Sequence, residues 1–201
     1  MNESLYYLIL FSVGFVASIV NTLAGGGSLL TLPVLIFLGL PSNVANGTNR
    51  ILILINSIVG TAGYKSKGVS TYPFNIYLGI SALFGALIGA EIAIGIKAEI
   101  FNRILSIVMI IFGLIILLRR NYDIEKITER VTGGYFWISV IAFFFIGIYG
   151  GFINAGIGIV IVIFLNSINR MTLIRANATK VALISIYTIG ALVLFVINGK
   201  V

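Results

Sequence analysis

The chain consists of long apolar runs separated by short polar links. Six runs of about 18 residues or more, the length an α-helix needs to cross a bilayer, cover residues 4–24, 44–64, 73–95, 101–118, 135–153 and 176–198. Two shorter runs, 28–40 and 156–166, would extend only about 16–20 Å as helices, so neither can cross alone. Apolar and polar residues do not alternate as they do in the strands of membrane barrels. The pattern predicts an all-α protein, a polytopic membrane helix bundle.

Composition agrees with an integral membrane protein. Hydrophobic residues make up 59% of the 201 residues and charged residues only 9%, and the mean hydropathy of +1.13 exceeds that of soluble domains. We therefore expect a multi-pass protein of the cell membrane, surrounded by the lipid bilayer. The first run has no basic segment before it and no cleavage pattern after it, so we interpret it as a retained helix.

Charge and missing residue types argue against several functions. The net charge is +7, but the basic residues stand singly at the ends of runs, so nucleic acid is not an expected partner. Cysteine and histidine are both absent, which excludes disulfides, imidazole proton carriers and most zinc or haem ligation. We expect no metal site and no cofactor.

A polar connector at residues 119–134 divides the chain into two related parts. Small and polar residues recur in register on both sides of it: Gly14, Asn21 and Gly25 as Gly147, Asn154 and Gly158, and Ala45, Asn46 and Thr48 as Ala176, Asn177 and Thr179. Amides and hydroxyls in register are less common by chance than apolar matches. We predict two pseudo-symmetric transmembrane repeats, 1–118 and 135–201, of which the second lacks its last helices. Chance similarity between glycine-rich helices is the alternative.

The distribution of Lys and Arg predicts the orientation, because these residues concentrate on the cytoplasmic side. If the runs 73–95 and 101–118 both cross, the links 65–72 and 119–134 share a side. That side carries Lys65, Lys67, Arg119, Arg120, Lys126 and Arg130, and the opposite side carries Lys97 and Arg103. We place the 119–134 connector in the cytoplasm. Whether the short runs re-enter or cross decides between inverted and parallel repeats, and the sequence leaves both open.

Three consecutive glycines interrupt the apolar sequence between the first two runs. Each costs about 1 kcal/mol in a helix interior relative to alanine, so the helix should break there. Backbone freed at membrane depth must face protein or a cavity, and the restarting helix would direct its N–H groups and positive dipole end into that cavity, where an anion is favoured. Close helix packing through small residues is the alternative. The candidate residues are Asn21, Gly25, Gly26, Gly27 and Ser28, with Asn154 and Gly158 as their counterparts.

A polar cluster follows Pro41. Asn46, Asn49 and Arg50 are spaced i, i+3 and i+4, so they share one helix face, which Asn56 extends. A cation surrounded by amide and hydroxyl donors suits a small oxyanion, although such cations can also be interfacial anchors. The candidate residues are Asn46, Thr48, Asn49 and Arg50, with Asn177, Thr179 and Lys180 in the second part. We expect the two threonines to line one shared anion site from opposite halves.

Other polar residues are interpreted as boundary groups. Glu91 is the one acid well inside an apolar run; it could carry a proton, but its position near Lys97 favours a boundary carboxylate. The tyrosines and Trp137 lie near run ends, and Arg175 lies in a short link, so we interpret them as interfacial anchors.

These motifs resemble those of the sulfite exporter / toluene-sulfonate uptake permeases, the TauE/SafE-type membrane transporters. The family pattern is G-x-x-x-x-x-x-N-x-x-A-G-G-G-S, followed by a proline-containing apolar piece and then A-x-G-T-(N/S). In this chain the pattern covers Gly14 to Ser28, Pro33 and Ala45 to Asn49, and more faintly Asn154 to Gly158 and Ala176 to Lys180. The resemblance implies about eight helices and transport of small sulfur-containing or organic anions, without a prosthetic group. This chain is short of the final helices of that pattern.

We therefore predict a permease that moves a small anion, such as sulfite, a sulfonate or another sulfur-containing oxyanion, by alternating access. The alternative is a non-transporting membrane subunit or a truncated fragment without independent activity. An enzyme is not expected, because the runs offer no Asp pair, no serine with a base and no metal site. The oligomeric state, the direction of transport and the coupling ion are left open by the sequence.

Overall fold

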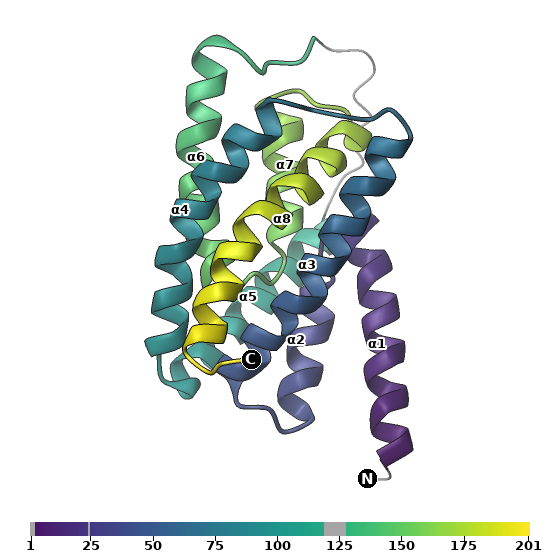
Figure 1. The fold of residues 1–201 in the computed structure, drawn as a ribbon, viewed down its shortest axis with the longest axis vertical. Coiled ribbons are helices and arrows are strands. Elements are labelled where there is room, and N and C mark those ends of the chain that lie inside the picture. Colours follow the sequence, from purple (N-terminus) through teal and green to yellow (C-terminus); the bar gives the residue numbers. More distant parts are fainter. Residues whose placement is uncertain (1–2, 24, 119–127) are drawn as a thin grey trace.

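The computed structural model describes residues 3–23, 25–118 and 128–201, and these residues form an all-helical bundle (Figure 1). In chain order the helices are α1 (Glu3–Leu23), α2 (Ser28–Phe37), α3 (Ser42–Ser66), α4 (Phe74–Gly95), α5 (Ala98–Leu118), α6 (Gly133–Phe152), α7 (Ile157–Ser167) and α8 (Leu173–Ile197). Each apolar run of the sequence corresponds to one helix, with bounds that agree within a few residues.

Within the described ranges, α4, α5, α6 and α8 are long and apolar enough to cross a membrane. Helix α3 has 25 residues and carries the polar cluster, which makes it less apolar than the others. A bundle of such helices satisfies its backbone hydrogen bonds internally, as a bilayer requires. The chain is a multi-pass membrane protein.

Both predicted helix breaks are present. Gly25 lies between α1 and α2 with a φ of +83°, a left-handed conformation that glycine adopts without steric cost. Between α6 and α7, Asn154 and Gly156 have positive φ values of 57° and 72°. Asparagine is among the few other residues that tolerate this conformation.

The two repeats are inverted (Figure 1). Helix α1 starts at the lower end of the bundle in this view, α2 returns to that end, and α3 then runs to the upper end. Helices α6 and α7 form the same hairpin from the upper end, and α8 runs back antiparallel to α3. The C-terminus accordingly lies beside the start of α3, where Lys200 O is in contact with Gly47. Each short helix leads back toward the end of the bundle at which the preceding helix began, so the repeats are inverted and not parallel (Figure 1).

Small residues bring α4 and α6 into backbone contact. A Cβ atom built on Gly85 or Gly89 of α4 would lie 2.0 Å from a backbone oxygen of α6. Gly147 and Gly151 of α6 meet the backbone of α4 in the same way, at 2.2 and 2.0 Å. Such small-residue contacts are a common means of helix association in membranes.

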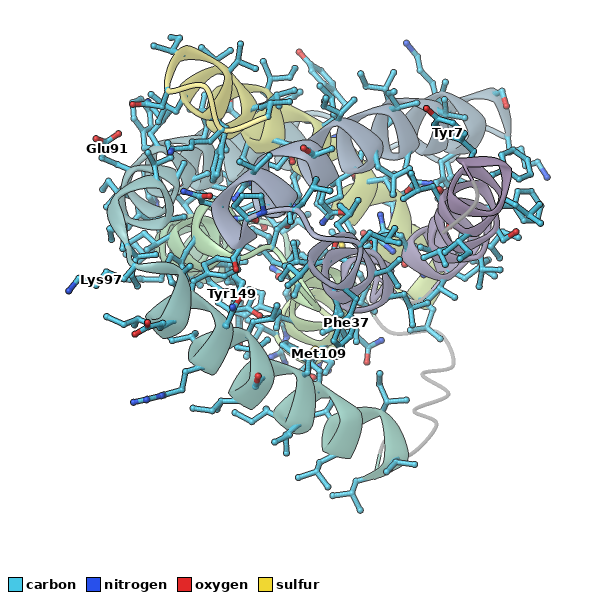
Figure 2. All side chains as sticks on the ribbon, turned by 90° about the horizontal axis from the view of Figure 1, so that it is seen from below. Tyr7, Phe37, Glu91, Lys97, Met109 and Tyr149 are labelled. Atoms are coloured by element: carbon cyan, nitrogen blue, oxygen red, sulfur yellow. The ribbon has the colours of Figure 1, made fainter. Side chains whose placement is uncertain are left out.

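Helix α5 lies along one face of the bundle when it is seen from below (Figure 2). At the nearby edge, Glu91 and Lys97 point away from the bundle, and both side chains are exposed. The interpretation of Glu91 as a boundary carboxylate, with no role inside the bundle, agrees with this position.

The basic links lie together at the upper end of the bundle. Residues of the α3–α4 link, residues 131–133 and Arg175 line one cavity of about 410 Å³. Nearby, the backbone N–H of Arg130 donates to Asn169 O of the α7–α8 link at 2.8 Å. This agrees with the prediction that residues 65–72 and the connector share a side. Arg119, Arg120 and Lys126 lie outside the described residues.

Candidate substrate site at the helix breaks

The two helix breaks meet inside the bundle. Gly25 and Gly158 are equivalent in the two repeats, and their backbones touch: a Cβ on either would lie 2.4 Å from backbone atoms of the other. Equivalent residues contact each other in this reciprocal way at the pseudo-two-fold axis that relates the repeats. The predicted breaks are non-helical, and the packing of the two repeats brings them together. Helices α2 and α7 thus begin near this axis with the positive ends of their dipoles.

Arg50, on α3, is fully buried and reaches the other repeat. Its Nη1 donates to Gly150 O at 3.2 Å and its Nη2 donates to Gly151 O, both near the end of α6. One turn earlier on α3, Asn46 Nδ2 donates to Phe152 O at 2.8 Å. The last carbonyls of a helix have no intrahelical partner, so the guanidinium and the amide together cap α6.

Lys180, on α8, makes the reciprocal contact with the first repeat. Its Nζ donates to Asn21 O at 2.9 Å and Thr22 O at 3.0 Å, at the end of α1, and to Asn177 Oδ1 at 2.7 Å. Lys180 and Arg50 are both 0% exposed, whereas an interfacial anchor keeps its charge in water. The anchor interpretation is therefore wrong for both residues. Each broken helix ends on a cation from the opposite repeat.

Arg50 pairs with no carboxylate among the side chains that the structure describes. The ion pair found there joins Arg175 to Glu129 near the upper end of the bundle. Glu91 and Glu99 are exposed to the surroundings of the bundle. Burying a charge without an opposite charge is expensive, and dipoles compensate only part of that cost. Arg50 therefore gives the interior of the bundle a positive charge that the carbonyl dipoles compensate only in part.

Several of the predicted site residues line two adjoining cavities in the first repeat. The larger, of about 140 Å³, lies between α1, α2 and α3; the smaller, of about 10 Å³, has room for about one water molecule. The polar residues of the larger cavity are Thr31, Thr48 and Asn49, and those of the smaller are Ser18, Asn21, Ser28, Thr31 and Asn56. Gly27 also lines the smaller cavity, and Gly26 is buried beside it in the chain.

Asn49 presents an unused donor in this region. Its Oδ1 accepts a hydrogen bond from Thr31 Oγ1 at 2.6 Å, whereas its buried Nδ2 has no partner among the described residues. Asn21 is already engaged, because its Nδ2 donates to Asn56 Oδ1 at 2.9 Å. An unpaired buried donor costs about 1–3 kcal/mol, and a ligand or water that accepts from it removes this cost. Asn49 is thus an amide of the larger cavity with an unused donor.

The candidate residues of the second repeat make contacts that differ from those of their counterparts in the first repeat. Asn177 is half-buried and holds Lys180, while Thr179 Oγ1 donates to Thr71 Oγ1 at 3.0 Å in the α3–α4 link. Thr48 lines the cavity between α1, α2 and α3, so the two threonines do not line one site, and that expectation is wrong. The reason is the inversion: equivalent residues near the starts of α3 and α8 lie toward opposite ends of the bundle.

Tyr187 is not the interfacial anchor predicted from the sequence, and Thr31 lines both cavities although no sequence motif indicated it. Tyr187 is fully buried in α8, and its Oη donates to Asn154 Oδ1 at 2.9 Å, so it supports the α6–α7 break and is not an anchor. Tyr149 Oη similarly donates to Ala155 O within that break. The sequence contained a signal for this role, because Tyr187 lies in the middle of its apolar run, whereas interfacial anchors lie near run ends. Trp137, near the start of α6, is 64% exposed, as expected of an anchor.

A comparison with known sequences identifies the family of this chain. The profile described as "Sulfite exporter TauE/SafE" matches residues 10–201. The chain belongs to the TauE/SafE family. A "Probable membrane transporter protein" of Haemophilus influenzae is 29% identical over 174 residues, which are 87% of this chain and 66% of the relative. The "Probable membrane transporter protein YfcA" of Escherichia coli K12 is 30% identical over 196 residues, 96% of this chain and 71% of the relative.

A third TauE/SafE relative, the "Probable membrane transporter protein ORF9" of Sinorhizobium, is 25% identical over 203 residues, which are 100% of this chain and 77% of the relative. The chain therefore spans 66% to 77% of the length of these three relatives. Their names are those of transporters and not of enzymes, in agreement with the expectation from the sequence. No solved structure matches the chain significantly.

Proposed function

We propose that this TauE/SafE chain transports a small anion across the cell membrane, most suitably sulfite or a similar sulfur oxyanion. The observation that carries the proposal is Arg50, a fully buried cation that forms no ion pair with a carboxylate among the described side chains. The family description names sulfite export, and the relatives are named as probable transporters.

The anion would bind in the cavity between α1, α2 and α3. The unused Nδ2 of Asn49 and the hydroxyl of Thr48 offer donors there, and α2 begins nearby at Ser28 with its positive dipole end. A volume of about 140 Å³ lies well below the roughly 300–1,000 Å³ of sites for drug-sized ligands. The cavity therefore favours sulfite over a bulky aromatic sulfonate.

Alternating access would use the inverted repeats. Two inverted halves that touch at Gly25 and Gly158 can rock about that contact and expose a site to either side in turn. The cations that cap the opposite repeat would hold the two halves together during this motion. The alternative that the sequence left open is a membrane subunit without transport of its own.

Flux measurements test the proposal. The 201-residue chain and the longer Escherichia coli relative are reconstituted separately in liposomes, and uptake of labelled sulfite is compared with uptake of toluene sulfonate and acetate. We expect sulfite flux through both proteins, with toluene sulfonate excluded. Flux through the relative but not through this chain would favour the subunit function, and flux through neither would contradict anion transport.

A charge reversal at the cavity gives a sharper test. Asn49→Asp keeps the size of the side chain but replaces the free donor with a negative charge, so the apparent affinity for sulfite should fall at least about 10-fold. Asn43→Asp is the matched control, because Asn43 Oδ1 accepts a hydrogen bond from the adjacent Val44 N and Asn43 lines neither cavity. Equal affinities of the two variants, measured by sulfite-dependent flux or calorimetry, would remove Asn49 from the site.

A further inference from the structure

The ammonium of Lys180 is held as a bound cation would be. Two backbone oxygens at the end of α1, Asn21 O and Thr22 O, and one side-chain oxygen, Asn177 Oδ1, surround Nζ at 2.7–3.0 Å. An ammonium has three hydrogens, and three acceptors use all of them. A neutral amine would direct its lone pair at one of these oxygens. The geometry therefore requires the protonated, positively charged form.

The oxygen set itself is suited to a monovalent cation. The final carbonyls of a helix carry the negative end of the dipole, and unwound or terminal carbonyls of broken membrane helices coordinate cations. Neutral amide oxygens complete the set without adding a negative charge, which suits a single positive charge. Ammonium and potassium ions are close in size, so both match the observed distances.

We propose that the oxygens of Asn21, Thr22 and Asn177 form a monovalent-cation site at the end of α1, and that the side chain of Lys180 is its built-in occupant. The wild-type protein then needs no dissolved cation at this position. Arg50 is the parallel case in the other repeat, where its guanidinium lies on Gly150 O and Gly151 O at the end of α6. The inference concerns cation binding and does not depend on the identity of the transported anion.

Shortening the lysine tests this site directly. Lys180→Ala removes the ammonium and opens the space that the aliphatic stem occupied, so a dissolved cation can enter. The thermal midpoint of the purified variant is measured in ammonium, potassium, sodium and choline chloride at equal ionic strength. We expect ammonium and potassium to raise the midpoint over choline by about 3 °C when present at about tenfold the dissociation constant, with a smaller shift in sodium.

Two controls isolate the site. Lys65→Ala removes an exposed lysine at the end of α3 and, like the wild type, should give the same midpoint in all four salts. The double variant Lys180→Ala with Asn177→Ala loses one of the three oxygens, so its response to ammonium should be smaller than that of Lys180→Ala. A Lys180→Ala protein that is recovered only in ammonium or potassium would support the proposal equally.

The proposal is overturned if Lys180→Ala behaves alike in all four salts, or if it is lost in every one of them, because a free cation would then not replace the ammonium. Transport gives a separate result. If the proposed anion transport is right, sulfite flux through Lys180→Ala should become dependent on ammonium or potassium. A cation-dependent midpoint without any flux in the wild type would contradict the transport function and leave the cation site supported.

Discussion

Gly25→Ala should destabilise the protein by about 3 kcal/mol or more and abolish flux. A Cβ at this position would lie 2.4 Å from the carbonyl carbon of Gly158, and the residue has a φ of +83° that alanine adopts only under strain. The obstructing atoms belong to a backbone and cannot turn aside as the tip of a side chain can. The two repeats would have to separate at the contact on their axis.

Gly26→Ala is the matched control for this prediction. Its nearest neighbours would be the side-chain methyls of Ile159 and Leu29, at 3.4 and 3.6 Å, which can yield by a small rotation. Thermal midpoints and size-exclusion profiles of both variants in the same detergent provide the measurement. Similar midpoints for the two alanine variants would show that the Gly25 contact does not hold the repeats together.

Arg50→Ala should cost about 2–6 kcal/mol, because two buried carbonyl oxygens lose their donors at about 1–3 kcal/mol each. The substitution leaves Gly150 O and Gly151 O without their donors and opens a cavity beneath the ring of Phe195, which lies 4.6 Å from the guanidinium carbon. Chemical or thermal unfolding measures the loss. Arg103→Ala, at an exposed position of α5, should change stability little.

Arg50→Lys separates capping from anion binding. A lysine retains the charge but lacks the fork that spans two carbonyls, so part of the stability should be lost. It also lacks Nε, which in Arg50 is buried and has no partner among the described residues. If that group contacts the anion, sulfite should raise the midpoint of the wild type but not that of Arg50→Lys. An equal response to sulfite in both proteins would confine Arg50 to capping α6.

The local architecture could be predicted from the sequence because the bilayer restricts the choices. A run of about 20 apolar residues in a membrane has few alternatives to a helix, and three glycines in succession break one. The register of Asn21 with Asn154 and of Gly25 with Gly158 was also visible in the chain. It indicated the duplication, and the structure brings the two glycines together.

Only the tertiary structure decided which groups meet. Arg50 reaches a carbonyl 100 residues away and Lys180 one 159 residues away, so their partners depend on how the two repeats pack. The spacing of Thr48 and Thr179 is the same in parallel and inverted repeats, but inversion sends them toward opposite ends. By itself the sequence determined the helices, their breaks and the duplication, because these follow from local hydropathy and backbone preference. The packing of one inverted repeat against the other decided that each buried cation caps the broken helix of its partner repeat.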